Sequence, residues 1–372
     1  RIAHLISDLG IAPYHIVAMT FTNKAAQEMR ARVETMLGAG ARGISMGTFH
    51  GLCAQVLRRH IDRLGYQTTF TIYDSHDQLA IVKQIEKEMN ISSERFQPQA
   101  VLGTISRFKQ DLLEPGQIST NGYNLFQNQA ARIYEVYQRR LQEANALDFD
   151  DLLNLVVRLF RTHEDVRANY GALWRYILVD EDQDRNKAQY TLLRLLTQSH
   201  TNISVVGDDD QSIYRWRGAT IQNILSFEKD FPGATVVKLE QNYRSTGTIL
   251  SVAHQMISKN SGRKPKKLWT AEGEGARAVL FTAETETREA EFVLEEIREL
   301  ARVRQGGWRD FAIFYRTNAQ SRALEQRLTI AGIPYAIVGG LKFYERKEIK
   351  DVLAYFRVLQ NSHDEVNLLR II

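Results

Sequence analysis

Two adjacent carboxylates, Asp180 and Glu181, lie at the end of the apolar run Tyr176–Asp180. A short apolar, β-branched run of this kind predicts a buried strand, and in a parallel sheet ligands bind beyond the carboxyl ends of the strands. A carboxylate pair at such a place suits a magnesium–nucleotide site, because one carboxylate holds the hydrated metal while the other accepts a proton from the attacking water. For the pair taken alone, a solvated acidic turn after a buried strand is the alternative interpretation.

A second apolar run, Ile203–Gly207, ends in three aspartates that are followed by Gln211. The amide of this glutamine is placed to hydrogen-bond a phosphate or a water. After a third predicted strand, Val236–Leu239, come Tyr243 and Arg244, where a ring can stack on a base and a guanidinium can neutralise a γ-phosphate. We therefore expect three neighbouring strand ends to deliver polar side chains to one nucleotide cleft. A salt bridge at a domain interface is the alternative for Arg244.

Hydroxyl, aromatic and cationic side chains gather in three further segments of the chain. Bases stack on rings, while hydroxyls, backbone amides and helix N-termini hold phosphates, so such clusters predict a surface for single-stranded nucleic acid. Taken singly, each aromatic belongs more often to a core, and it is the repetition that favours binding. The segments are Thr20–Ala26, Gly47–Gly51 and Tyr214–Arg217.

Apolar runs alternate with helical patterns along the chain, which predicts an α/β fold with a parallel sheet covered by helices on both faces. Residues 73–165 differ, because they show long helical periodicity and no strand candidate, as an all-helical insertion would. The remaining predicted strands are Ile16–Phe21, Phe311–Tyr315 and Tyr335–Val338.

The length of 372 residues suggests two or three domains. We predict a first α/β domain over 1–72 and 166–240, interrupted by the helical insertion over 73–165. A loop-rich stretch over 259–276 suits an exposed connection. It falls within a second α/β domain that is expected to cover 241–372.

The composition, with 44% hydrophobic and 25% charged residues, is that of a soluble globular protein. The 48 basic residues only slightly outnumber the 44 acidic ones, so a role with nucleic acid must rest on local patches. The single cysteine, Cys53, excludes an intrachain disulfide and a cysteine metal cluster, and a reducing, cytoplasmic setting is expected. No run of 18 apolar residues and no leader pattern is present, so we expect no membrane association.

Eight sequence blocks, in order along essentially the whole chain, resemble the superfamily 1A DNA helicases of the PcrA/UvrD/Rep family, and most of all its PcrA branch. The resemblance implies two RecA-like P-loop NTPase motor domains, each interrupted by a helical subdomain. It also implies ATP-dependent 3′-to-5′ translocation on single-stranded DNA, unwinding of duplex DNA in repair or replication, ATP and Mg²⁺ as cofactors, and duplex–single-strand junctions as substrates. The blocks are TFTNKAAQEMR, GTFHGLC, LDFDDL, VDEDQD, VVGDDDQSIYRWRGA, LEQNYRST, FYRTNAQSR and GGLKFYERKEIKD.

The same resemblance implies roles for individual residues. Asp180 would hold magnesium and Glu181 would activate water. Gln211 would sense the γ-phosphate, Arg244 would contact it across the cleft, and Tyr243 would stack on adenine. The positions that match DNA-facing residues of the family are Phe21, Thr48, His50, Phe149, Tyr214, Trp216 and Arg217. Gln211 shares a short loop with Tyr214, Trp216 and Arg217. A change at the phosphate is therefore expected to move the rings on which bases stack.

The chain also departs from the family pattern. The glycine-rich phosphate loop with its lysine would lie before Arg1, no GKT or GKS follows a strand, and later motor motifs would lie beyond Ile372. Both ends therefore look cut, and we expect little or no ATPase activity from this chain alone. Asp182 stands where the family has an aromatic, and Arg185 where it has threonine. An extra carboxylate beside the metal is expected to raise the pKa of neighbouring carboxyl groups.

Two functions of different classes stay open at the level of sequence. One is an ATP-driven DNA helicase motor, and the other is a non-catalytic single-stranded nucleic-acid-binding module with a degenerate ATP site. A lysine-bearing phosphate loop before Arg1 would favour the motor. A third function, the motor part of a recombination nuclease, lacks support because no nuclease-like cluster of spaced acidic residues and lysine is present.

Overall fold

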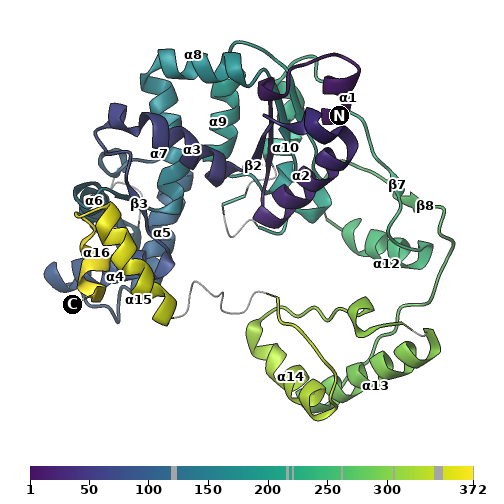
Figure 1. Cartoon of the computed structure of the whole chain (residues 1–372). Helices are drawn as coiled ribbons and strands as arrows, with labels where there is room; N and C mark the ends of the chain where they lie inside the picture. The colour runs from purple at the N-terminus through teal and green to yellow at the C-terminus, as the bar shows by residue number, and fades with distance from the viewer. Residues whose placement is uncertain are drawn as a thin grey trace. The chain divides into compact units, whose positions relative to one another are not determined.

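The computed structural model describes residues 1–118, 124–214, 218–219, 222–260, 263–304, 306–338 and 347–371 (Figure 1). Two compact units are formed. The first contains residues 1–237, 260–265 and 350–372, and the second contains residues 238–259 and 266–349. The predicted start of the second domain at 241 lies near this boundary, and residues 350–372 group with the first unit.

The first unit is built on a four-stranded parallel sheet with the strand order β2-β1-β5-β6. The central strand β1 is buried along its whole length, which explains why its sequence is continuously apolar. The predicted strands at Ile16–Phe21, Tyr176–Asp180 and Ile203–Gly207 are confirmed with bounds one or two residues shorter. The four strands are β1 (Ile16–Thr20), β2 (Ser45–Thr48), β5 (Tyr176–Val179) and β6 (Ile203–Val205).

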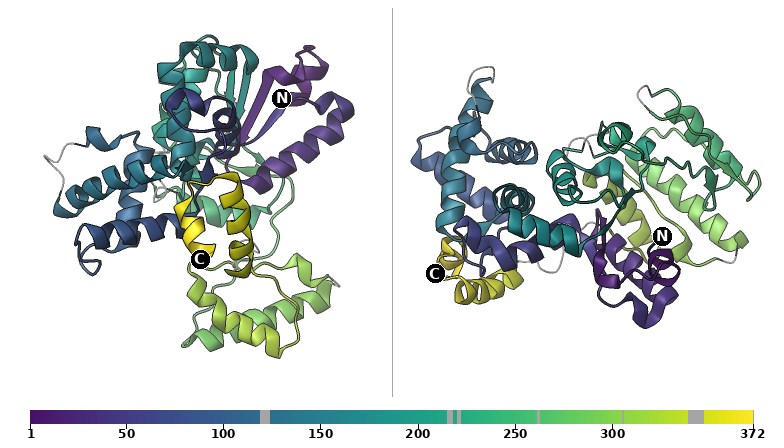
Figure 2. Two further views of the ribbon diagram at one scale, coloured as in Figure 1. Left: turned by 60° about the vertical axis from the view of Figure 1, so that its left-hand side comes forward. Right: turned by 90° about the horizontal axis from the view of Figure 1, so that it is seen from above.

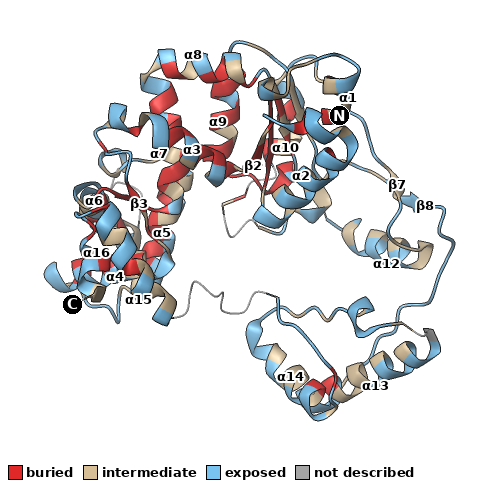
Figure 3. Cartoon of the chain, viewed as in Figure 1, coloured by how far each residue is buried: buried red, intermediate tan, exposed pale blue. Residues whose placement is uncertain are grey.

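Helices cover both faces of this sheet, as the sequence predicted (Figure 2). Val17 and Met19 of β1 point into a core with the helices of one face, whereas Ile16 and Ala18 point into a core on the other face. Figure 3 shows the buried residues concentrated in these layers. One face carries α3 (Phe49–His60), α7 (Phe149–Thr162), α8 (Glu164–Leu173) and α9 (Lys187–Leu196), and the other carries α1 (Ile2–Ser7) and α2 (Asn23–Leu37).

The helical insertion has its own apolar core, formed between Tyr73 and Ala146. Its helices α4, α5 and α6 pack on one another and project from the sheet (Figure 2). Within the predicted insertion, 73–165, helix α7 packs on α3 and α9 in the core of the sheet domain. The insertion also contains strand residues, contrary to prediction. Its elements are β3 (Thr71–Ile72), α4 (Ser75–Glu88), α5 (Pro98–Gln110), α6 (Leu125–Glu143) and β4 (Ala146–Leu147), with β3 parallel to β4.

Two C-terminal helices, α15 (Lys347–Gln360) and α16 (Glu365–Ile371), lie against this insertion (Figure 1). The Nδ2 of Asn361 donates to the carbonyl oxygens of Ala144 and Asn145 at 2.8 and 3.1 Å. The hydroxyl of Tyr73 donates to the fully buried Asp364 at 2.6 Å. These buried polar contacts explain why the C-terminal segment groups with the first unit.

The second unit contains a two-stranded parallel sheet and three helices among its described residues. Three predicted strands, Val236–Leu239, Phe311–Tyr315 and Tyr335–Val338, are wrong, because none of them pairs with a neighbour in the described chain. Their side chains are largely exposed, as at Val237, Phe314 and Val338. The elements are β7 (Gln241–Asn242), α12 (Gly247–Ile257), β8 (Trp269–Thr270), α13 (Glu286–Arg304) and α14 (Ser321–Ile330), and two short helices, α10 (Gln222–Leu225) and α11 (Phe227–Asp230), belong to the first unit.

Candidate functional site

The segments that leave β1, β5 and β6 run side by side at one edge of the sheet. The backbone amide of Asp180, just beyond β5, donates to the carbonyl oxygen of Met19 in β1 at 2.9 Å. The amide of Asp182 donates to the carbonyl oxygen of Val206, just beyond β6, at 3.0 Å. Two of the three predicted strand ends therefore meet, and the acidic pair lies beside the aspartate-rich segment that follows β6.

Asp180 and Glu181 are both exposed at this edge. The amide of Glu181 donates to the Oδ1 of Asp180 at 3.0 Å, which holds the two residues in a tight turn. Glu181 has left-handed backbone angles, φ 54° and ψ 46°, which are unusual for a residue with a side chain. Such angles persist where the surroundings hold them, and they occur often at functional sites.

The donor atoms at this edge fit magnesium. Mg²⁺ prefers oxygen ligands, retains several waters and takes one or two carboxylates from the protein. Within the described residues no group of three or more His, Cys, Asp and Glu side chains is arranged to hold a metal ion. The role of Asp180 as a magnesium ligand stays a prediction.

The aspartates after β6 differ in their partners. The Oδ1 of Asp208 accepts the amide of Asp210 at 3.0 Å and caps the short helix η6 (Asp209–Gln211). The side chain of Arg263 binds both oxygens of Asp210, at 2.6 and 2.8 Å, and the amide of Lys264 donates to Asp209 at 2.7 Å. The basic segment 263–264 therefore holds the acidic loop in place, which no local sequence signal predicted.

The amide of Gln211 donates to the Oδ2 of Asp208 at 2.7 Å, so its side chain is tied to the start of η6. Sequence reasoning missed Gln183, which is buried between the segment after β5 and the segment after β6. Its position two residues after Glu181 could have marked Gln183 as a candidate. The sequence does not show which groups a glutamine there would hydrogen-bond, so no role could be predicted.

Asp182 does not act on the site as expected. Its side chain is completely buried and forms an ion pair with Arg185, which is buried as well. The guanidinium of Arg185 also lies 5.4 Å from the centre of the Tyr190 ring. The two departures from the family pattern thus compensate each other. Among the neighbouring carboxyl groups, the pKa of Asp184 is raised to about 6, by burial and by Glu181 and not by Asp182.

Four of the predicted DNA-facing residues form two aromatic pairs. The ring of Phe21 stacks on Tyr214, with centroids 5.2 Å apart, and the ring of His50 meets the edge of Phe149 at 6.2 Å. Phe149 is 50% exposed. Burial lowers the pKa of His50, which is therefore neutral at pH 7.

Thr48 lies at the junction of β2 and α3. Its hydroxyl oxygen accepts the amide of Gly51 at 3.2 Å and caps α3, while the hydroxyl proton can still be donated to a phosphate. Trp216 and Arg217, the other two predicted DNA-facing residues, lie outside the described residues.

Tyr243 and Arg244 belong to the second unit. They follow β7, which pairs with β8 in a separate sheet, so the expectation of a third neighbouring strand in the first sheet was wrong. The ring of Tyr243 is largely exposed, and its hydroxyl donates to Gln241 at 2.7 Å. The roles of both residues at a nucleotide stay predictions.

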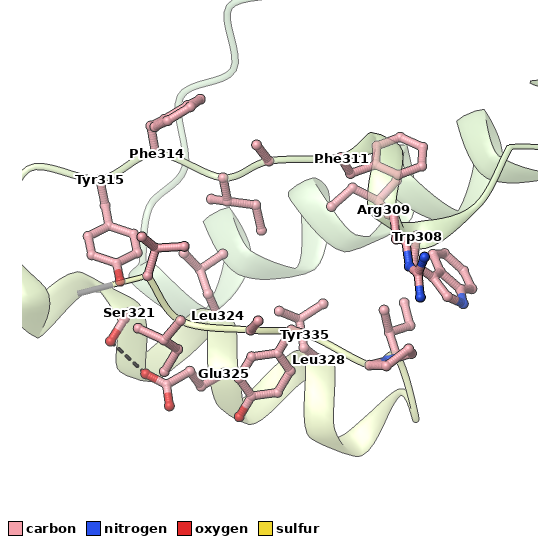
Figure 4. A pocket seen from close by; sticks show the side chains of 18 of the residues that line it. Trp308, Arg309, Phe311, Phe314, Tyr315, Ser321, Leu324, Glu325, Leu328 and Tyr335 are labelled. Carbon is pink, nitrogen blue, oxygen red and sulfur yellow. Dashed lines mark hydrogen bonds between the residues drawn. The ribbon is translucent and has the colours of Figure 1, made fainter. Parts of the chain in front are cut away.

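A pocket of about 1000 Å³ opens elsewhere, within the second unit (Figure 4). Its wall combines α14 with the segments 307–315 and 333–338, and it is lined mainly by apolar side chains such as Phe311, Leu328 and Ile333. It contains none of the predicted site residues. We therefore assign the candidate site to the edge of the sheet in the first unit.

The fold and its acidic edge place the first unit in the class of parallel α/β domains that bind ligands beyond the carboxyl ends of their strands. Residues 1–232 match the family model of the UvrD/REP helicase N-terminal domain, and residues 237–372 match that of the UvrD-like helicase C-terminal domain. The chain belongs to the UvrD/REP helicase family.

Curated relatives agree with this assignment. The chain is 49% identical over 374 residues to the ATP-dependent DNA helicase PcrA of Staphylococcus aureus (strain Mu50 / ATCC 700699), with 100% of this chain and 51% of that protein covered. It is 48% identical over 372 residues to the ATP-dependent DNA helicase PcrA of Bacillus subtilis (strain 168), with 100% of this chain and 50% of that protein covered. The chain thus spans about half the length of the curated relatives it matches. In the described part of the chain, no helix has the length and apolar character needed to cross a membrane.

Proposed function

We propose that this chain is part of an ATP-dependent DNA helicase that moves 3′ to 5′ along single-stranded DNA and unwinds duplex DNA at junctions, in repair or replication. The observation that carries the proposal is the meeting of the acidic pair after β5 with the Gln211 segment after β6, at one edge of a parallel sheet. The family and the printed names of its relatives support it. Because those relatives are bacterial DNA helicases, we place the activity in the cytoplasm.

The residues at this edge have separate tasks. Asp180 would hold the magnesium of magnesium–ATP, whose hydrolysis would supply the energy for movement. Glu181, exposed beside it, accepts the proton of the attacking water. Gln211 hydrogen-bonds the terminal phosphate, and Arg244 of the second unit neutralises it. Tyr243 stacks on the adenine base.

Single-stranded DNA would bind over the aromatic pairs. Phe21 with Tyr214 and His50 with Phe149 offer ring faces and edges for bases, and Thr48 offers a hydroxyl for a phosphate. Tyr214 follows Gln211 by three residues. A shift of η6 at the phosphate therefore moves one member of a base platform.

The test uses the intact protein, assayed for ATP hydrolysis with and without oligo(dT) and for unwinding of duplexes with a 3′ or a 5′ tail. We expect DNA-stimulated hydrolysis and a preference for the 3′ tail. Glu181→Gln should lower hydrolysis about 100- to 10 000-fold, the usual contribution of a general base, and leave the affinity for oligo(dT) nearly unchanged.

Glu34→Gln, an exposed glutamate of α2, is the matched control and should behave as wild type. Undiminished turnover in Glu181→Gln would remove Glu181 from its role. Tight DNA binding without any hydrolysis by the wild-type protein would favour the non-catalytic binding module.

A further inference from the structure

We propose that Gln183 is a positioning residue that joins the general base Glu181 to the phosphate-sensing Gln211 through one continuous line of hydrogen bonds. The proposal rests on the proposed function, which it deepens by naming the part that couples the two strand ends. Gln183 itself need not touch the nucleotide.

The side chain of Gln183 spans the gap between two strand ends. It is 1% exposed, its Nε2 donates to the Oε2 of Glu181 at 2.6 Å, and its Oε1 accepts the backbone amide of Asp208 at 2.9 Å. A carboxylate can only accept and a backbone N–H can only donate, so the two partners fix which way the amide group points. No other uncharged side chain of this length offers a donor and an acceptor in that arrangement.

The line continues from Asp208 to Gln211. The Oδ2 of Asp208 accepts the side-chain amide of Gln211 at 2.7 Å, and its carbonyl oxygen accepts the backbone amide of Gln211 at 2.9 Å. Three hydrogen bonds, through Gln183 and Asp208, thus connect the Glu181 carboxylate with the Gln211 amide. A displacement of η6 is transmitted to Glu181 because each link is short and the central one is buried.

The backbone around Gln183 is adapted to this contact. A Cβ atom at Gly207 would lie 2.8 Å from the Oε1 of Gln183 and 2.9 Å from the Cβ of Asp182, so a side chain there would push Gln183 out of its present position. On the other side, Glu181 has the left-handed backbone that directs its carboxylate back towards Gln183. The close approach of Gly207 on one side and the left-handed backbone of Glu181 on the other indicate that the surrounding structure is adapted to hold Gln183 in this position.

The functional consequence concerns coupling. Glu181 must meet the attacking water only when Gln211 has found the phosphate, and Tyr214 on the same segment contacts Phe21 on the proposed DNA surface. Without the bridge, nucleotide and DNA should each still bind, but the binding of one should no longer alter the response to the other.

The test compares Gln183→Met with Gln189→Met in the intact protein. Methionine keeps the length of the side chain and removes both hydrogen bonds. Gln189 is a buried glutamine of the same region, 4% exposed, whose side-chain oxygen accepts the backbone amide of Asn186 and caps the first turn of α9. Oligo(dT) affinity is measured with and without a non-hydrolysable ATP analogue and Mg²⁺, together with kcat and KM for ATP.

For Gln183→Met we expect kcat to fall about 10- to 100-fold, the usual effect of losing an outer-shell partner, with KM for ATP within about 3-fold of wild type. The ratio of oligo(dT) affinities with and without the analogue should fall towards 1. Gln189→Met should lower the melting temperature but retain the wild-type kcat and ratio. A merely structural role for Gln183 would move the melting temperature in both variants and the ratio in neither.

Wild-type kcat and a wild-type affinity ratio in Gln183→Met would overturn the bridge while leaving the proposed function intact. Absence of DNA-stimulated hydrolysis in the wild-type protein would instead refute the proposed function first. If Gln183→Met does not fold, the same measurements are made on Gln183→Asn. The asparagine side chain is polar but too short to reach both Glu181 and Asp208. In Gln183→Asn, a ratio of oligo(dT) affinities near 1 supports the bridge, and a ratio equal to that of the wild type overturns it.

Discussion

Asp184 shows how the environment of a single carboxyl group tunes this edge of the sheet. Burial and, after it, the neighbouring Glu181 raise its pKa from 3.8 to about 6. Its Oδ1 is buried and has no hydrogen-bond partner among the described residues. The charged form of Asp184 therefore weakens the folded state, which is an acceptable cost at a site that gathers carboxylates for function.

Asp184→Asn should consequently stabilise the protein in a pH-dependent way. A carboxyl group whose pKa is higher in the folded state binds its proton more tightly there, so its unfavourable effect is absent below about pH 4 and complete above about pH 6. We expect the variant to melt at a higher temperature than wild type at pH 8, and this advantage should shrink below about pH 6 and disappear near pH 4. Thermal unfolding across that range measures it. An offset that is equal at all pH values would show that ionisation of Asp184 is not its cause.

At the scale of elements, a buried charged cluster joins the helical insertion to the sheet domain. The side chain of Lys109 on α5 is fully buried and binds Asp148 and Asp151 at the start of α7, at 2.6 and 2.7 Å. Asp148 also accepts the hydroxyl of Tyr137 at 3.0 Å. Burial lowers the pKa of Lys109, but the two carboxylates outweigh it and hold that pKa above its usual value. The lysine is therefore charged at neutral pH.

Replacing Lys109 with methionine should leave two carboxylates buried without their cation. Losing one partner of a buried ion pair typically costs about 3 to 5 kcal/mol, and we expect a loss of that size in the free energy of unfolding, measured by urea denaturation. Lys83→Met, on the exposed face of α4, is the control and should stay within about 0.5 kcal/mol of wild type. A loss below about 1 kcal/mol in Lys109→Met would contradict the account of the cluster.

Elements were predictable from sequence where local pattern and final packing agree. β1, β5 and the acidic residues beyond β5 followed from apolar runs and their polar ends. The runs Phe311–Tyr315 and Tyr335–Val338 have the same pattern, but a strand also needs a paired neighbour, and local pattern does not reveal whether one is present. The role of Gln183 was hidden for a related reason, since its partners Glu181 and Asp208 belong to segments after different strands.

For the whole molecule, the division into two units separates the proposed site residues. Asp180, Glu181 and Gln211 belong to the first unit, whereas Tyr243 and Arg244 belong to the second. The C-terminal helices α15 and α16 join the first unit through contacts such as Asp364 with Tyr73, which are almost 300 residues apart in the chain. Contacts at that separation leave no periodic signal in the sequence, which is why the second domain was expected to continue to residue 372.

The most direct measurement for the central claim is a structure of the intact protein with Mg²⁺ and a non-hydrolysable ATP analogue. We predict that the carboxylate of Asp180 binds magnesium at about 2.1 Å or through one of its waters. The side chains of Gln211 and Arg244 should lie about 3 Å from oxygens of the terminal phosphate. A nucleotide bound away from the carboxyl ends of β5 and β6, with Asp180 and Gln211 turned from its phosphates, would contradict the account.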